Sequence, residues 1–222
     1  MQHTDSPTPP THQRTAAGNR RRPSGARPAR EATPPKPLHP VLAQLAELYP
    51  ALFGEVLRPL KRGIFQDLLD AQPEALDKEG LKAALALHTR STRYLSAVAS
   101  GAQRHDLSGQ PVEALLPEQV HHALVEVFRR RQTRTAEDLS PKFRQRVEQA
   151  FEQSGLSRED YAEKVLGRDE QVNALTLEAL AEVAGRQARD EALRRAFTAS
   201  GLSEADFASS YGMPLREVMR AL

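Results

Sequence analysis

The sequence of 222 residues contains no cysteine and no tryptophan, and only 5% of its residues are aromatic. Without cysteine the chain can form neither a disulfide framework nor a thiolate metal site, which is typical of a reducing compartment. With few aromatic residues, the core must consist mainly of Leu, Ala and Val, a composition that suits helices. No apolar run approaches a membrane span, and the N-terminus lacks the apolar stretch of a secretory signal. We therefore expect a cytoplasmic protein without a membrane partner.

Positive charge is unevenly distributed, although the formal net charge is only +2. Residues 1–36 are rich in Pro, Ser, Thr and Ala and show no apolar periodicity, so we expect a disordered basic arm. Its arginines would attract phosphates non-specifically, and the alternative is a solubilising tail without a partner. These arginines are Arg14, Arg20, Arg21, Arg22, Arg27 and Arg30.

Residues 37–131 show the apolar spacing of several short helices. A first helix is expected to begin near Pro40, because proline fits the first helical position, and to end before Pro50. Pro59 and Gly63 indicate a turning segment before the next helix. Further helices are expected to begin at Asp77, Ser91 and Pro117, since Asp and Ser are good N-caps.

Two further segments bear on fold and chemistry. Residues 104–112 predict a short β-hairpin with Ser108 and Gly109 in its turn. The pair His121 and His122 suggests metal binding, but neighbouring residues on a helix point about 100° apart and cannot easily bind one ion. No catalytic carboxylate pair, nucleophile–base set or Gly-rich phosphate loop occurs in residues 37–131. We expect no enzyme, no cofactor and no metal.

The stretch His88–Leu95 has the most distinctive chemistry, with two arginines, three hydroxyl residues, one histidine, one tyrosine and no acid. Guanidinium groups and hydroxyls bind phosphate, and tyrosine offers a ring or hydroxyl to a base or sugar. Between Lys82 and Ser108 lie four basic residues and one Asp. This concentration of charge is expected of a nucleic-acid face. The alternative is a polar turn between two helices.

Four blocks of this segment together resemble the FinO/ProQ family of bacterial RNA-binding proteins and RNA chaperones. They are Arg58–Leu68, Leu81–Leu85, Thr89–Leu95 and Gly101–Gly109. Their order and spacing hold across residues 37–131. The resemblance implies a compact, mainly helical domain with a small β-hairpin. It implies binding of structured RNA, such as small RNAs, mRNA 3′ ends and terminator-like hairpins with a single-stranded 3′ end. Members stabilise small RNAs or assist their pairing.

The resemblance also implies a set of RNA-binding residues. A concave basic face would include Lys61, Lys78, Lys82, Arg93 and Arg104, and a pocket for the RNA end would use Thr89, Ser91, Arg93 and Tyr94. Relatives often carry aromatic residues at the positions of His88 and Thr92, and some carry an arginine at Ala86. Arg62 and Arg90 are candidates to replace part of that charge. The alternative for Tyr94 is a core position in the helix that follows Ser91.

A linker at residues 132–139 is expected to lead into a second helical region at residues 140–222, which contains a repeat. Ala150–Ala162 and Ala196–Ala208 share eight of thirteen residues at an offset of 46. Each copy predicts a helix, a Gly stop, a Leu-Ser cap and another helix. We expect this region to begin with a cap at Ser140, and a long helix capped by Thr176 to lie between the copies.

The second copy also resembles a helix-turn-helix, and the first does so less closely. In DNA-binding versions the last helix carries polar residues into the major groove. Here Arg216 and Arg220 flank Glu217, and the region is net acidic. Three alternatives follow: an RNA-binding protein, a DNA-binding regulator that uses the duplicated helix-turn-helix-like unit, or a protein-interaction scaffold. We favour the first, with a helical packing or protein-interaction role for residues 140–222.

Overall fold

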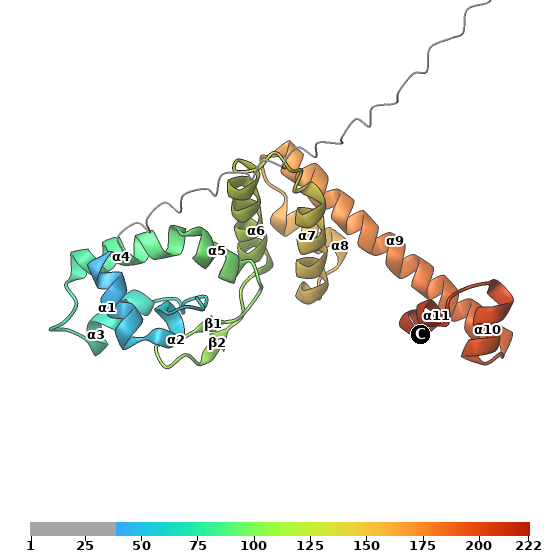
Figure 1. Cartoon of the computed structure of the whole chain (residues 1–222), viewed down its shortest axis with the longest axis horizontal. Coiled ribbons are helices and arrows are strands. Elements are labelled where there is room, and N and C mark those ends of the chain that lie inside the picture. Colours follow the sequence, from blue (N-terminus) through green and yellow to red (C-terminus); the bar gives the residue numbers. More distant parts are fainter. Residues whose placement is uncertain (1–38) are drawn as a thin grey trace, which may run out of the picture. The chain divides into compact units, whose positions relative to one another are not determined.

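The computed structural model describes residues 39–222, in which helices alternate with short loops (Figure 1). The basic arm expected at residues 1–36 lies outside the described residues. Within residues 39–222, no helix combines the length and the apolar character that a membrane span needs.

Eleven helices and two short strands make up the described residues, which confirms the expected mainly helical class. The first eight elements are α1 (Pro40–Leu48), α2 (Pro50–Phe53), α3 (Ile64–Ala71), α4 (Lys78–Arg90), α5 (Thr92–Val98), β1 (Arg104–His105), β2 (Pro111–Glu113) and α6 (Pro117–Gln132). The last five are α7 (Ser140–Ser154), α8 (Arg158–Val165), α9 (Glu170–Ser200), α10 (Glu204–Tyr211) and α11 (Leu215–Ala221).

The caps of α4 and α5 are those that the sequence predicts. The Asp77 carboxylate accepts hydrogen bonds from the N–H groups of Glu79 and Gly80. The Ser91 hydroxyl accepts one from the N–H of Tyr94 at 3.1 Å. Each bond satisfies backbone donors that a helix start leaves without an intrahelical partner. The two caps therefore fix the corner between α4 and α5, where the candidate site lies.

The expected β-hairpin is present, and β1 and β2 pair in antiparallel orientation. In its turn the Asp106 carboxylate accepts hydrogen bonds from the N–H groups of Ser108 and Gln110. The backbone of His105 also exchanges hydrogen bonds with residues 59–61. The hairpin is thus attached to the segment that precedes α3.

The start of α9 differs from the prediction. The helix begins at Glu170, where the Asp169 carboxylate accepts a hydrogen bond from the N–H of Val172. Thr176 lies inside the helix, fully buried, and its hydroxyl donates to the carbonyl of Val172 at 2.9 Å. The predicted cap at Thr176 is therefore wrong, because Asp169, whose side chain is also a good N-cap, begins the helix seven residues earlier.

The start of α7 also differs in its cap. The helix begins at Ser140 with Pro141 in its first turn, as the proline predicts. The N-cap residue is Leu139, however, and its side chain makes no capping bond. The expected side-chain cap at Ser140 is therefore wrong.

Helices α1 to α9 share one hydrophobic core. It contains Leu45 of α1, Leu81 of α4, Tyr161 of α8 and Leu180 of α9, all almost fully buried. Phe128 of α6 and Phe143 of α7 stack across the loop that joins these two helices, with ring centroids 4.7 Å apart. The domain boundaries expected at residues 131 and 140 stay predictions, but the two segments that they separate pack together.

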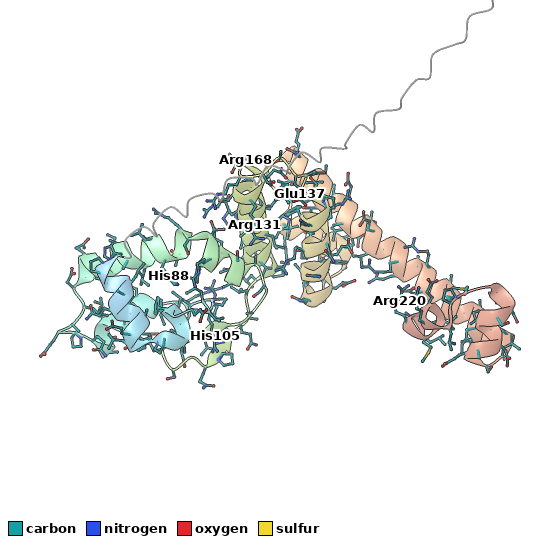
Figure 2. All side chains as sticks on the ribbon, in the orientation of Figure 1. His88, His105, Arg131, Glu137, Arg168 and Arg220 are labelled. Carbon is teal, nitrogen blue, oxygen red and sulfur yellow. The ribbon has the colours of Figure 1, made fainter. Side chains whose placement is uncertain are left out.

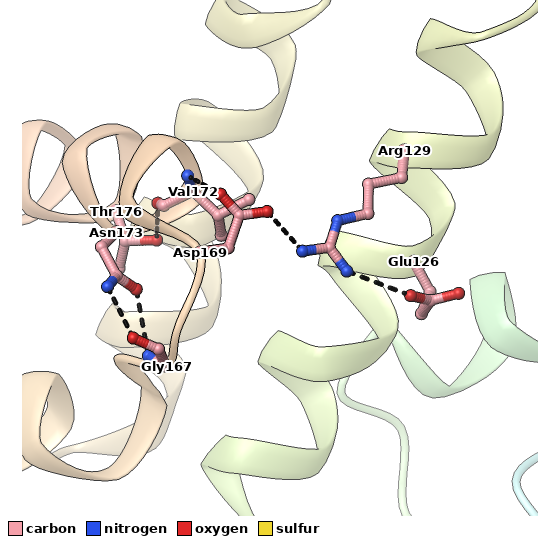
Figure 3. A network of polar contacts seen from close by, with 7 residues as sticks. All are labelled: Glu126, Arg129, Gly167, Asp169, Val172, Asn173 and Thr176. Atoms are coloured by element: carbon pink, nitrogen blue, oxygen red, sulfur yellow. Dashed lines mark hydrogen bonds and ion pairs between the residues drawn. The ribbon is translucent and has the colours of Figure 1, made fainter.

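Polar contacts also join α6 to α9. Arg129 pairs with Asp169, the N-cap of α9, and with Glu126 on its own helix (Figure 3). His121 and Thr176, both buried, are joined by a hydrogen bond of 3.0 Å between Nε2 and the hydroxyl oxygen. Because buried polar groups need partners, this pair fixes the register of α9 against α6.

The two copies of the repeat share one local conformation. Gly155 and Gly201 end their helices in the left-handed region, with φ of 65° and 62°. Ser157 and Ser203 then cap the next helices through their hydroxyls. The end of α9, α10 and α11 form a second, smaller core around Phe207. The DNA-reading helix-turn-helix is not confirmed.

Candidate RNA-binding site

The His88–Leu95 stretch forms the corner where α4 ends and α5 begins. Ser91 is the C-cap of α4 and the N-cap of α5, so its hydroxyl is engaged by the backbone. The hydroxyl of Thr89 donates to the carbonyl of Leu85 at 2.8 Å. Both side chains remain partly exposed. Each hydroxyl oxygen has a lone pair left, so both can still accept a hydrogen bond from a ligand.

Tyr94 is a core residue, although its edge also lines an open cavity of about 320 Å³ together with Arg104. Its side chain is only 6% exposed, and its hydroxyl accepts a hydrogen bond from the N–H of Leu60 at 3.1 Å. Burial raises the pKa of the Tyr94 hydroxyl. The structure therefore agrees with the alternative in which Tyr94 is a core position of the helix that follows Ser91. The contribution of Tyr94 to a site is to hold the α4–α5 corner in place.

His88 packs as an aromatic core residue. Its ring lies between those of Phe53 and Tyr94, with centroid distances of 4.9 and 5.1 Å. Burial lowers the pKa of His88 to about 4, and the charge of Arg93 adds to this effect. The ring is therefore neutral at pH 7. It occupies a position where relatives often carry aromatic residues, and it meets other rings inside the core.

Arg104 is held inside the fold. Its Nη1 donates to the carbonyl of Leu60 at 2.8 Å, and its Nη2 donates to Oε1 of Gln119 at 3.1 Å. Its Nε lies 3.5 Å from the Glu113 carboxylate, and the side chain is 16% exposed. These contacts join β1 to the segment before α3 and to α6. Arg104 therefore has little freedom to reach a ligand.

Lys61 and Arg62 are paired with acids at the surface. Lys61 Nζ lies 2.8 Å from the Asp67 carboxylate, and this hydrogen bond raises the pKa of Lys61. Arg62 Nε lies 3.7 Å from the Glu113 carboxylate. Exposed ion pairs of this kind are weak, so a phosphate can compete for both cations.

Four of the expected cations are exposed and form no ion pair within residues 39–222. Arg93 donates to the backbone carbonyl of Glu55, which leaves its charge without an acid. The other three lie on α4, where Lys82 is one helical turn beyond Lys78. The set, which we term the free cations, comprises Lys78, Lys82, Arg90 and Arg93.

The structure adds arginines from α6 that the sequence did not assign to the site. Arg130 Nη1 donates to the carbonyl of Arg90 at 2.6 Å, and Nη1 also lies 3.5 Å from the hydroxyl of Thr92. Arg131 is exposed and has no ion pair within the described part of the chain (Figure 2). The run Arg129–Arg131 is visible in the sequence, but only the packing of α6 on α5 brings Arg130 to the corner. Arg129 pairs with Asp169, and Arg131 lines a cavity beside α7.

Comparison with known proteins places this chain in a family. Residues 35–140 match the model of the ProQ/FinO family. A solved FinO-like RNA chaperone from Neisseria meningitidis is 32% identical in sequence, and the match covers 37% of this chain and 85% of that one. The chain belongs to the ProQ/FinO family. The resemblance seen in the sequence is thereby confirmed.

Two further relatives support the assignment. A ProQ homolog from Legionella pneumophila is 30% identical, with 52% of this chain and 99% of that one covered. The RNA chaperone ProQ of Shewanella oneidensis is 46% identical over 88 residues, 37% of this chain. The match covers only 41% of that curated relative's length. The two solved structures give TM-scores of 0.35 and 0.37, so the relationship depends on sequence identity.

A cavity of about 430 Å³ lies where the ProQ/FinO segment meets α7. Its apolar lining includes Leu124, Phe128 and Phe143, whereas Arg131 and Arg146 supply positive charge. No acidic side chain lines it. The cavity therefore carries positive charge on α7, beyond the region that the family model matches.

Proposed function

We propose that residues 39–132 bind structured RNA and that the protein acts as an RNA chaperone which supports small-RNA stability and pairing. The observation that carries this proposal is the set of free cations, which are spread along α4 and reach the α4–α5 corner of a ProQ/FinO domain. The ligands would be small RNAs, mRNA 3′ ends and terminator-like hairpins. The proposal requires binding and release of RNA and no catalytic step.

The surroundings of the free cations suit duplex RNA. An A-form helix hides its base edges in a deep and narrow major groove, so a protein recognises its shape, phosphates and 2′-hydroxyls. Exposed cations without acidic partners gain the most from a phosphate, because they lose no existing ion pair and release condensed counterions. Lys61 and Arg62 add charge once the phosphate replaces their surface carboxylates.

A single-stranded 3′ end would bind at the corner itself. The hydroxyls of Thr89 and Ser91 can each accept from a ribose hydroxyl, and the Arg93 guanidinium can pair with the neighbouring phosphate. Tyr94 and Arg104 would position the corner from within the core and would not touch RNA.

Competition binding tests the proposal directly. The probes are a hairpin with a single-stranded 3′ tail, the same hairpin without the tail, the tailed hairpin with a 3′-phosphate, and duplex DNA. We expect the tailed hairpin to bind most tightly and the 3′-phosphate to weaken binding. The double variant Lys82→Ala and Arg93→Ala should reduce affinity and lower the salt slope by about two, one for each lost phosphate contact. Arg189→Ala on α9, where the wild-type arginine is exposed and forms no ion pair within residues 39–222, is the matched control and should change neither.

The outcomes separate the parts of the proposal. Equal affinity for duplex DNA and for the hairpins would contradict RNA recognition. Equal affinity for blocked and free 3′ ends would contradict recognition of the RNA end, but it would not contradict phosphate binding by the free cations.

A further inference from the structure

The two copies of the repeat differ in what covers them. The offset of 46 residues equates α8 with α10 and the start of α9 with α11. In the first copy α6 packs over these elements. His121 of α6 contacts the ring of Tyr161 at a centroid distance of 6.4 Å and is hydrogen-bonded to Thr176. Val165 and Val172 lie beside them and are at most 9% exposed. The first copy is therefore buried under one helix.

The second copy carries apolar side chains at six positions whose counterparts in the first copy lie beside α6, although Lys164, which also lies there, corresponds to Ser210. The six positions of the first copy are Tyr161, Val165, Asp169, Val172, Asn173 and Thr176. Their counterparts are Phe207, Tyr211, Leu215, Val218, Met219 and Leu222. Three positions that are polar in the first copy have thus become apolar.

Four of these counterparts are exposed. Phe207 and Val218 are fully buried in the small core, but Tyr211 and Met219 are each 59% exposed, Leu215 is 43% exposed and Leu222 is 44% exposed. Within residues 39–222 no helix covers them as α6 covers the first copy. We call these four side chains the α11 stripe.

The α11 stripe is concentrated in one short segment, residues 211–222, unlike the other large exposed apolar residues. Leu215, Met219 and Leu222 are spaced by four and three residues, which places them on one side of a helix. Elsewhere large exposed apolar residues, such as Leu87 and Leu177, come singly from different elements. Single exposed apolar residues are ordinary, whereas a contiguous patch marks an interaction surface.

We propose that the α11 stripe binds the same stripe of a second copy of this chain, so that two α11 helices cover each other in a symmetric dimer. The first copy shows that this face accepts an amphipathic helix. Among the described helices, α11 is the one with an uncovered apolar side. A two-fold axis makes one surface its own partner. Arg216 and Glu217 flank the stripe with opposite charges and form no ion pair within residues 39–222, so Arg216 of one copy can pair with Glu217 of the other across antiparallel helices.

Sedimentation velocity over a range of protein concentrations tests the dimer. We expect wild type to shift from monomer to dimer as concentration rises, because an interface made by a few apolar side chains gives reversible association. Met219→Lys and Leu215→Glu should each weaken dimerisation at least tenfold. Leu177→Lys on α9, where the wild-type side chain is 48% exposed, is the matched control and should not. Circular dichroism confirms that each variant folds. A wild type that stays monomeric throughout, or a dimer unaffected by both stripe variants, would overturn the proposal.

The absence of cysteine allows a second test in which the fold is hardly disturbed. Met219→Cys gives the chain a single thiol, and a short bismaleimide should link two such chains covalently. Leu177→Cys should give little linked product at the same concentration. If both variants gave equal amounts of cross-linked dimer, or if neither gave any, the α11 stripe would not be a dimer interface. An amphipathic helix of a different protein would then be the partner to test. No RNA enters either test, so their failure leaves the proposed RNA binding untouched.

Discussion

At the scale of single residues, Arg93 and Arg104 show how differently two arginines of one expected set are placed. The Arg93 side chain is exposed and donates to one backbone carbonyl, whereas Arg104 contacts Leu60, Gln119 and Glu113 from a largely buried position. Removing a buried charged group leaves its partners unsatisfied, which costs more than losing a surface contact.

We expect Arg104→Ala to lower the free energy of unfolding by about 2–4 kcal/mol. Arg93→Ala should change it by less than about 0.5 kcal/mol while weakening RNA binding. Urea unfolding of both variants measures the difference. If the Arg104→Ala variant were as stable as wild type but bound RNA less tightly, Arg104 would be an RNA-binding residue and not a structural one.

The hydroxyl of Tyr94 provides a second prediction. Tyr94→Phe removes the acceptor of the Leu60 N–H and should cost about 1–2 kcal/mol of stability. Because the hydroxyl is buried, the folded variant should bind tailed RNA as wild type does. Ser91→Gly is a useful companion, since glycine still permits an N-cap but removes a hydroxyl proposed to meet RNA. A loss of RNA affinity in folded Tyr94→Phe would place the hydroxyl in the site.

The buried histidines make stability depend on pH. The pKa values of His88 and His121 are each lowered to about 4 by burial, against 6.5 in the unfolded chain. Between these values the unfolded state binds more protons, so stability is complete above about pH 6.5 and falls as the pH drops towards 4. By pH 5 each histidine should cost about 2 kcal/mol. His88→Phe should lose part of this dependence when urea unfolding at pH 7 and pH 5 is compared. An unchanged difference would show that the pKa of His88 in the fold is close to its value in the unfolded chain.

At the scale of elements, α6 links the family domain to the following helices. Its side chains reach the α4–α5 corner through Arg130 and meet α7 and α9 through Phe128 and His121. Such a helix is apolar on more than one side, and its buried residues include Val120, Leu124 and Val127.

Truncation tests this role of α6. Deleting residues 140–222 removes Phe143 and Tyr161 from the shared core and exposes apolar surface of α6, so the remaining domain should melt at a lower temperature and aggregate more readily. Deleting residues 203–222 removes only the small second core and should leave the main transition in place. Thermal unfolding followed by circular dichroism compares the two. Equal melting temperatures for full-length protein and the shorter fragment would show that residues 39–139 fold independently.

At the scale of the whole molecule, the chain combines a family domain with a helical extension that the family match does not reach. The extension begins by completing the core of the domain, and it ends in a unit whose apolar stripe is uncovered. If both proposals hold, a dimer presents two RNA-binding surfaces, which would favour the meeting of two RNAs by raising their effective concentration.

The basic arm provides a prediction at this scale. Deleting residues 1–36 should weaken RNA binding modestly and mainly at low salt, because its arginines act through screened attraction to phosphates. The preference for tailed over untailed hairpins should survive. Binding curves at two salt concentrations measure both effects, and a lost preference would mean that the arm itself recognises RNA.

The sequence by itself determined the local features: the caps at Asp77 and Ser91, the hairpin turn, and the four ordered blocks that identify the family. These depend on residues a few positions apart, so pattern and propensity suffice to predict them. Only the tertiary structure decided that Tyr94 and Arg104 face inward, that Arg130 meets Arg90, and that α7 to α9 share the core of the domain. The reason is physical. The exposure of a side chain depends on which distant part of the chain packs over it. The local sequence pattern around a helical residue is the same whether or not such a covering surface exists. Thr176 is covered by α6, whereas its counterpart Leu222 is exposed.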